Sequence, residues 1–134
     1  MKTKPILTAE DVKAILAAAE KHANEHKWVV TIAVADDGGH LLGMLRLDGA
    51  APITAEIAPA KARTAAMGRR ESKVYEEIIN QGRHSFLSAP MTGMLEGGVP
   101  VVIDQQIVGA VGVSGVKSSE DAEIARAGIA ALNP

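Results

Sequence analysis

Two pairs of apolar, β-branched runs, each pair joined by a short turn signal, set the tightest limit on what this chain can fold into. The four runs span 29–36, 40–48, 99–103 and 106–115. Asp37-Gly38-Gly39 joins the first pair and Asp104-Gln105 joins the second, and turns this short connect antiparallel neighbours. The sequence therefore predicts two hairpins in one antiparallel sheet, with 29–36 and 106–114 at its centre because they are the most apolar.

Segments with helical periodicity lie before, between and after the two predicted hairpins in the sequence. Apolar residues at helical spacing predict helices over about 9–26, 54–70, 73–80 and 119–132. Thr8 with Asp11, and Ser118 with Asp121, have the spacing of capping boxes at two of the helix starts, and Ser72 is predicted to cap a third helix.

The order of these elements indicates the α+β class. A helix, a hairpin, two helices, a long loop over 83–98, a second hairpin and a last helix predict a sandwich of two or three layers. At 134 residues we expect a single domain over 1–134. The 23 alanines bury little apolar area per residue, so a subunit interface is expected to add stability and a homo-oligomer is favoured.

Composition excludes several classes of function. A net charge of −2 and 2% aromatic residues argue against nucleic-acid binding through phosphate contacts or base stacking. The absence of cysteine excludes thiolate ligands and nucleophiles. No apolar run approaches the roughly 20 residues that span a bilayer, so no membrane partner is expected. The first residues lack the apolar core of a signal peptide, and we expect a cytoplasmic protein.

Glycines at 109, 112 and 115 invite comparison with nucleotide-binding loops, but their spacing is wrong for the dinucleotide fingerprint. A P-loop needs glycine directly before lysine, whereas Val116 precedes Lys117. Glycines in a central strand instead favour close approach of a helix or a ligand. Backbone amides over 114–118, at a helix start, could also hold an anion.

Histidines, methionines and a basic turn supply the remaining candidates. His22 and His26 lie one helical turn apart and can face a metal together, but the apolar stripe favours hydrogen-bonded residues at the edge of the core, and no metal site is expected. His40, His84 and Met91 are candidate axial ligands of a haem. The basic turn could meet a carboxylate of a ligand, and it consists of Lys61, Arg63, Arg69 and Arg70.

Three segments resemble a known family. They are Ala58-Pro-Ala-Lys61-Ala-Arg-Thr64-Ala65, GGVPVVID at 97–104, and VGAVGVSGVKSSEDAEIARAG at 108–128. On these motifs the chain resembles the GlcG/HbpS family, whose domain is similar to the C-terminal part of PduO-type proteins. The resemblance covers nearly the whole chain.

The resemblance implies a profilin-like or PAS-like fold with a five-stranded antiparallel sheet, the fifth strand falling near 91–96. It also implies homo-oligomers and, in some members, haem binding or degradation. The absence of cysteine means that Cys ligation of haem is not carried over to this chain. The implied pocket lies between the helix of Lys61, the loop 83–98 and the strand end 112–115. Its candidate ligand-binding residues are Lys61, Arg63, Thr64, His40, His84, Met91, Gly112 and Ser114.

Three functions follow from this reading. The first is a non-enzymatic protein that binds a small ligand, with haem or a related tetrapyrrole as the expected cofactor, and that works in a catabolic operon. The second is an enzyme, or an accessory to one, acting on a small carboxylate or aldehyde. The third is a structural or regulatory domain that oligomerises. No catalytic constellation is found in the sequence, which favours the first function over the second.

Overall fold

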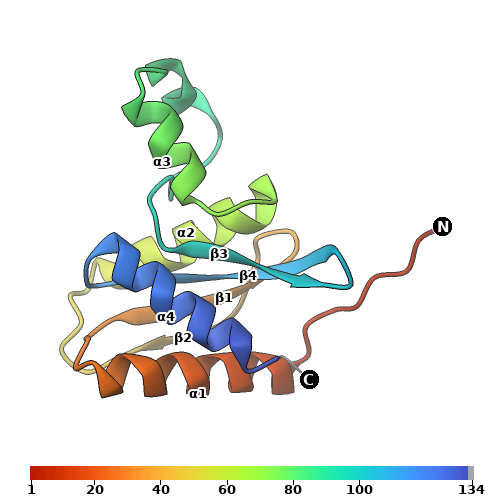
Figure 1. The fold of residues 1–134 in the computed structure, drawn as a ribbon, viewed down its shortest axis with the longest axis vertical. Coiled ribbons are helices and arrows are strands. Elements are labelled where there is room, and N and C mark those ends of the chain that lie inside the picture. The colour runs from red at the N-terminus through yellow and green to blue at the C-terminus, as the bar shows by residue number, and fades with distance from the viewer. Residues whose placement is uncertain (133–134) are drawn as a thin grey trace.

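The structure, a computed structural model, describes residues 1–132, so the last two residues of the predicted domain over 1–134 lie outside it. The predicted helices and hairpins are confirmed, with ends shifted by a few residues (Figure 1). In chain order the elements are α1 (Ala9–Glu25), β1 (Thr31–Asp36), β2 (Leu41–Arg46), α2 (Thr54–Gly68), α3 (Lys73–Asn80), the 3-10 helix η1 (His84–Ser88), β3 (Gly98–Ile103), β4 (Gln106–Ser114) and α4 (Ser118–Ala130).

The sheet is antiparallel throughout the part of the chain that the structure describes, with four strands in the order β2-β1-β4-β3. The predicted central strands β1 and β4 do lie at its centre, paired from Thr31 opposite Ser114 to Asp36 opposite Gly109. Each outer strand is a hairpin partner, as the turn signals predict. The α+β class is therefore confirmed.

The fifth strand expected near 91–96 is wrong, because within residues 1–132 this segment forms bends and turns rather than a strand. Gly93 explains the difference. A Cβ built at Gly93 would overlap the backbone of Ala60, so this segment packs against α2 instead of pairing with an edge of the sheet.

Helices cover both faces of the sheet, which makes three layers (Figure 1). On one face α1 and α4 lie side by side and bury the main core. Its largest fully buried side chains are Ile15, Ile32, Ile124, Val34, Val111 and Val113. The other face is covered by α2, whose alanines pack on a surface of small residues around Ala110. This alternation of large and small faces along β4 follows from the two-residue period of a strand.

Gly112 decides how closely α2 approaches the sheet. A Cβ at this position would overlap the carbonyl oxygen of Ala58 and lie 2.5 Å from the backbone nitrogen of Ala62. The helix backbone therefore rests directly on the backbone of the central strand. The prediction that the glycines of this strand allow close approach of a helix is confirmed.

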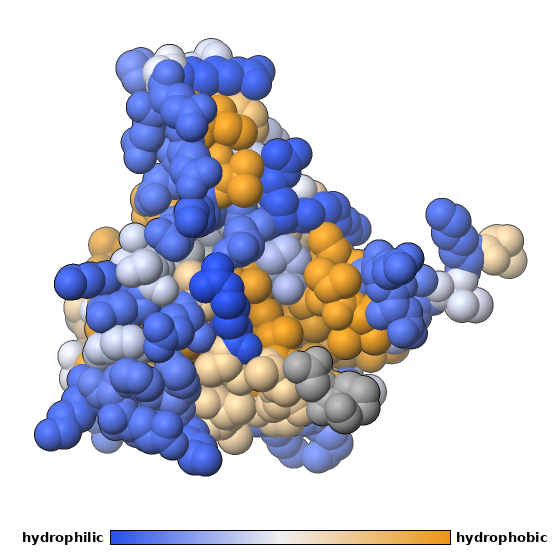
Figure 2. All heavy atoms as spheres, in the orientation of Figure 1, coloured by the Kyte–Doolittle hydropathy of each residue, from blue (hydrophilic) through white to orange (hydrophobic). Residues whose placement is uncertain are grey.

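α3, η1 and residues 89–96 form an arm that projects from the sandwich, with Gly93 packed against α2 at its base (Figure 1). Tyr75 holds its base, since the ring lies over Gly68 at the end of α2 and stacks on Phe86 of η1 at a centroid distance of 5.3 Å. Figure 2 shows hydrophobic side chains at the surface of this arm, among otherwise hydrophilic ones. Leu87 and Leu95 are exposed on it.

The side-chain caps predicted at the starts of α1 and α3 have different outcomes. The box of Thr8 and Asp11 at the start of α1 is confirmed. The prediction that Ser72 caps α3 is wrong, because its side chain makes no capping bond. Its hydroxyl instead accepts a hydrogen bond from Gly98 N at 2.8 Å and donates to the Leu95 carbonyl. Ser72 thus fastens the end of the arm to the first residue of β3.

No helix within residues 1–132 has both the length and the apolar character needed to cross a membrane.

Replacing Gly112 by alanine tests the contact between α2 and the sheet. The added methyl must push α2 away from β4, so we expect the free energy of unfolding to fall by about 1–3 kcal/mol, as is usual for overpacking. Urea unfolding followed by circular dichroism measures it. Gly38→Ala is the matched control, since its Cβ would meet no atom closer than 3.4 Å. Equal stability of both variants would contradict the proposed role of Gly112.

Candidate functional site

A buried ion pair lies where the sheet meets both helical layers. The ammonium of Lys61, from α2, donates to the Asp121 carboxylate of α4 at 3.1 Å and to the Val113 carbonyl at 2.9 Å. Lys61 is 3% exposed and Asp121 is 2% exposed. The other carboxylate oxygen of Asp121 accepts from Val116 N at 3.1 Å. Each charge is therefore paired and hydrogen-bonded, as buried charges require.

Burial raises the pKa of the Asp121 carboxyl above its ordinary value, and the charge of Lys61 acts in the opposite direction. The ionised form of Asp121 therefore depends on Lys61. The backbone also packs closely around the Lys61 side chain, since a Cβ built at Gly97 would lie 2.7 Å from Lys61 Nζ.

The sequence analysis does not identify Asp121 as the partner of Lys61. It assigns Asp121 to a capping box with Ser118. That assignment is wrong, because α4 starts at Ser118 and the residue that bonds back to the Lys117 amide is Glu120. One of the amides over 114–118 that could hold an anion, Val116 N, donates to the chain's own Asp121. The signal that could have revealed this partner is a lysine set among alanines on a helix face, whereas the sequence analysis expects Lys61 to meet a carboxylate of a ligand.

Four of the candidate ligand-binding residues are buried within the sandwich, and their observed contacts are internal. These are Lys61, Thr64, Gly112 and Ser114. Contact of these four with a ligand stays a prediction.

Arg63 and His40 lie on the same part of the surface. Both are exposed, and the turn before His40 packs on α2 because a Cβ at Gly39 would lie 2.9 Å from Arg63 Cγ. Arg69, at the end of α2, donates to the carbonyl of Asp37 in the same turn. Two members of the predicted basic turn therefore border the turn between β1 and β2.

The other two candidates lie on the arm. His84 begins η1 and is exposed, and Met91 is half-buried just beyond it. Between α3 and this segment is a largely apolar cleft of about 290 Å³. Its lining consists of Glu76, Ile79, Asn80, Leu87, Thr92, Met94 and Leu95. The candidates thus form two groups on different parts of the molecule, one on the arm and one beside the turn between β1 and β2.

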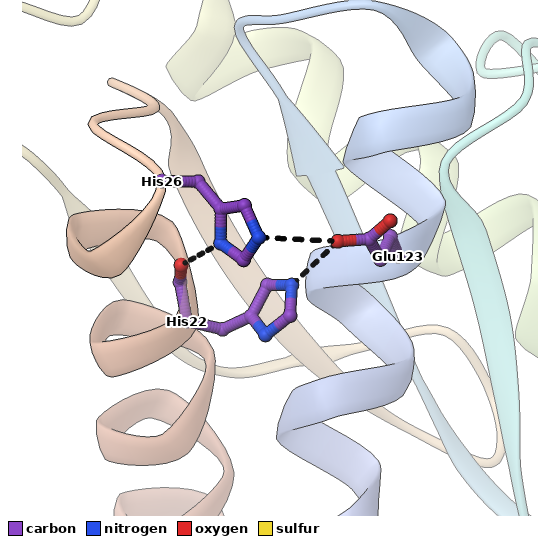
Figure 3. A group of neighbouring side chains, drawn as sticks. All are labelled: His22, His26 and Glu123. Carbon is purple, nitrogen blue, oxygen red and sulfur yellow. Dashed lines mark hydrogen bonds and ion pairs between the residues drawn. The ribbon is translucent and has the colours of Figure 1, made fainter.

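His22 and His26 are brought next to Glu123, a residue that the sequence reasoning did not single out (Figure 3). His22 Nε2 lies 2.7 Å from the Glu123 carboxylate, and His26 Nδ1 lies 2.8 Å from the His22 carbonyl. The predicted hydrogen bonding of these histidines is confirmed, but the side chain of His26 is 41% exposed rather than set into the core. Nothing local in the sequence indicates Glu123, because it lies 101 positions from His22.

Comparison with known proteins establishes the family to which this fold belongs. The sequence model of a family described as "Haem degrading protein HbpS-like" matches residues 7–130. The chain belongs to this HbpS-like family. It is 60% identical to protein GlcG of Escherichia coli K12 over 114 residues, which cover 85% of each chain.

Two solved structures share the fold. The crystal structure of a double mutant of HbpS from Streptomyces reticuli matches with a TM-score of 0.90 at 31% identity, covering 100% of this chain and 92% of that one. The crystal structure of a PduOC:heme complex matches with a TM-score of 0.86 at 25% identity, covering 96% of each chain. The resemblance drawn from the sequence motifs is confirmed.

Removing one partner of the ion pair tests its role in holding the layers together. Lys61→Met leaves the Asp121 charge buried and unpaired, so we expect a loss of about 3–5 kcal/mol in the free energy of unfolding at pH 7. The double variant Lys61→Met/Asp121→Leu, which removes both charges, should lose much less. Denaturant unfolding of the two variants gives the comparison, and an equal loss in both would contradict a paired-charge role.

The same variant carries a pH prediction. Without Lys61 the cause that lowers the Asp121 pKa is gone, so the folded pKa lies further above the unfolded value. A carboxyl whose pKa is higher in the folded than in the unfolded state binds more protons when the protein is folded. It therefore destabilises the fold increasingly as the pH rises from the unfolded pKa to the folded pKa. Lys61→Met should therefore be less destabilised, relative to wild type, near pH 4.5 than at pH 7. Unfolding at both pH values measures this, and Lys73→Met, an exposed lysine, is the control.

Proposed function

We propose that this protein binds haem or a related tetrapyrrole as a homo-oligomer, without catalysing a reaction of its own. The observation that carries the proposal is the close similarity of its fold to a chain whose crystal structure is a haem complex. The family description, which names haem as the molecule acted on, supports the same ligand class.

The chemistry of the arm fits such a ligand. A tetrapyrrole needs an apolar surface for its ring, and the cleft between α3 and residues 87–95 presents mostly apolar side chains. Haem iron accepts imidazole and thioether ligands, and His84 and Met91 carry these groups on the same arm, close in sequence to residues that line the cleft. We assign the iron contact to these two residues, with His40 as the alternative imidazole.

Charge near the turn between β1 and β2 fits the propionate end of the ligand, and since this turn and the iron ligands lie on different parts of one molecule, the two ends would be held by different copies of the chain. A haem propionate pairs well with a guanidinium, and Arg63 is exposed there beside His40. The buried residues of the predicted set support these contacts by fixing α2 and the base of the arm. They are Lys61, Thr64, Gly112 and Ser114.

A second copy of the chain completes the proposed site. The arm cleft, at about 290 Å³, is slightly smaller than the roughly 300–1,000 Å³ typical of ligand pockets. The cleft lies on the arm, which projects from the sandwich (Figure 1), and apolar side chains reach the surface of that arm (Figure 2). Exposed apolar residues on the edge strand β2, Leu41, Leu42 and Met44, offer a further surface for assembly.

A haem titration tests the ligand. We expect a shifted and sharpened Soret band at micromolar haem, saturating at a fixed ratio of haem to subunit. His84→Ala should change the band position and weaken binding at least tenfold, whereas Arg63→Ala should weaken binding with the band unchanged, because it removes only a charged partner. Ser85→Ala, beside His84 in η1, is the matched control.

Three outcomes of this titration are decisive. An unchanged Soret band in wild type contradicts the proposal as a whole. A shift that survives both His84→Ala and His40→Ala contradicts the assigned ligands. Steady loss of the band when a reductant and oxygen are added would favour an enzyme that degrades haem, as the family description states.

Assembly is tested by native mass spectrometry of freshly purified protein. We expect an oligomer, and we expect Leu87→Lys, which places a charge on the exposed surface of the arm, to shift the population toward monomers. Leu95→Lys tests the same surface a second time, and Ile6→Lys, on an exposed segment away from the arm, is the control. A monomeric wild-type protein would contradict the oligomer.

A further inference from the structure

The end of α1 and the first turns of α4 bring together three side chains that the proposed haem site does not use (Figure 3). One ring nitrogen from each of His22 and His26, together with one carboxylate oxygen of Glu123, lie within 4.8 Å of one another. The carboxylate oxygen is 2.7 Å from His22 Nε2 and 4.0 Å from His26 Nε2. Two ligands of a tetrahedral Zn²⁺ with bonds of about 2.0 Å lie roughly 3.3 Å apart, a value between these two distances.

The surroundings of His26 orient it as a ligand. Its Nδ1 lies 2.8 Å from the His22 carbonyl, which can only accept, so Nδ1 carries the proton. In the neutral ring Nε2 then holds a free lone pair, and Figure 3 shows that it faces Glu123. A backbone carbonyl that fixes the tautomer in this way is the usual outer-shell partner of a metal-bound histidine.

Trp28 fixes the plane of the same ring. Its indole stacks on the His26 imidazole at a centroid distance of 4.4 Å with an interplanar angle of 21°. The His22 ring lies 4.5 Å from that of His26 at 32°. The two imidazoles are therefore held side by side by the indole and by their one-turn spacing on α1, while their side chains stay 25% and 41% exposed and within reach of an ion in solvent.

We propose that His22, His26 and Glu123 form a site for a divalent transition-metal ion, with Zn²⁺ as the natural occupant. Two imidazoles and one carboxylate are borderline donors that suit zinc, and a water molecule would complete the tetrahedron. The ion takes the place of the proton between His22 Nε2 and the carboxylate. A neutral His22 then carries its proton on Nδ1, and a proton is released to solvent only when the ring was doubly protonated before binding. This site does not depend on the haem proposal.

A metal here would join the two ends of the chain. His22 and Glu123 are 101 positions apart, and α1 meets α4 on the same face of the sheet. An ion bound only in the folded state stabilises that state by mass action. The site would therefore act as a removable clamp between the first and the last helix.

The experiment uses untagged full-length protein after treatment with a chelator, because a histidine tag would bind the same metals. Calorimetric titration with Zn²⁺ should give one ion per subunit with micromolar or tighter affinity, and the thermal midpoint should rise. Cu²⁺ should quench the emission of Trp28, the only tryptophan in the sequence, since its ring stacks on a proposed ligand. Co²⁺ should give visible d–d absorption without any substitution in the protein.

Single substitutions assign the ligands. His22→Gln, His26→Gln and Glu123→Gln should each weaken Zn²⁺ binding by more than the roughly 10–100-fold typical of an outer-shell change. Glu25→Gln, on the same helix, and His84→Gln, a histidine on the arm, are the controls and should bind as wild type does. Circular dichroism of the metal-free variants checks that each is folded.

Three results would overturn the proposal. The first is that wild-type protein gives no heat in the Zn²⁺ titration and no visible d–d absorption with Co²⁺. The second is Zn²⁺ binding by Glu123→Gln within threefold of wild type, which would leave only the histidine pair of one helix. The third is binding that is lost in His84→Gln, which would place the ion on the arm.

Discussion

The buried pair of Lys61 and Asp121 is the contact on which the arrangement of layers depends. It is the point where a helix from each side of the sheet meets the end of the central strand, since Lys61 also donates to the Val113 carbonyl. Because neither charge is exposed to water, each requires the other to be in place. The position of α2, the start of α4 and the end of β4 are therefore set together rather than one by one.

Close packing at Gly112 has a second effect, on where a ligand can bind. The helix α2 lies against the sheet backbone, so the glycine-rich part of β4 faces a helix and not an open recess. The largely apolar cleft of the arm lies at the periphery instead. A ligand of the proposed kind would therefore bind at the edge of the fold and not against its central strand.

Much of the fold could be predicted from the sequence because its signals are local. The two hairpins follow from alternating apolar runs and their turns, and the central place of β1 and β4 follows from their lack of polar faces. The fifth strand could not be excluded in this way, since only the contact of Gly93 with the side of α2 shows why its segment stays out of the sheet. Ser72 and Asp121 were assigned to helix caps because capping is what their spacing predicts.

The candidate site was harder to predict, because its contacts join residues that are distant in sequence. Lys61 and Asp121 are 60 positions apart, and His22 and Glu123 are 101 apart. A sequence pattern can indicate that a buried lysine needs a carboxylate, but it cannot say which one. The grouping of His40 with Arg63, and of His84 with Met91, likewise depends on how α2 and the arm are placed.

The pairing of α1 with α4, and of β1 with β4, bears on how the protein is made. During synthesis the first helix and the first strand leave the ribosome long before the residues that will cover them, because those partners lie in the last third of the chain. Non-local pairing of this kind slows folding and leaves apolar surface exposed to aggregation. The main core can therefore close only after β4 and α4 have been made, and until then α1 and β1 leave apolar surface uncovered.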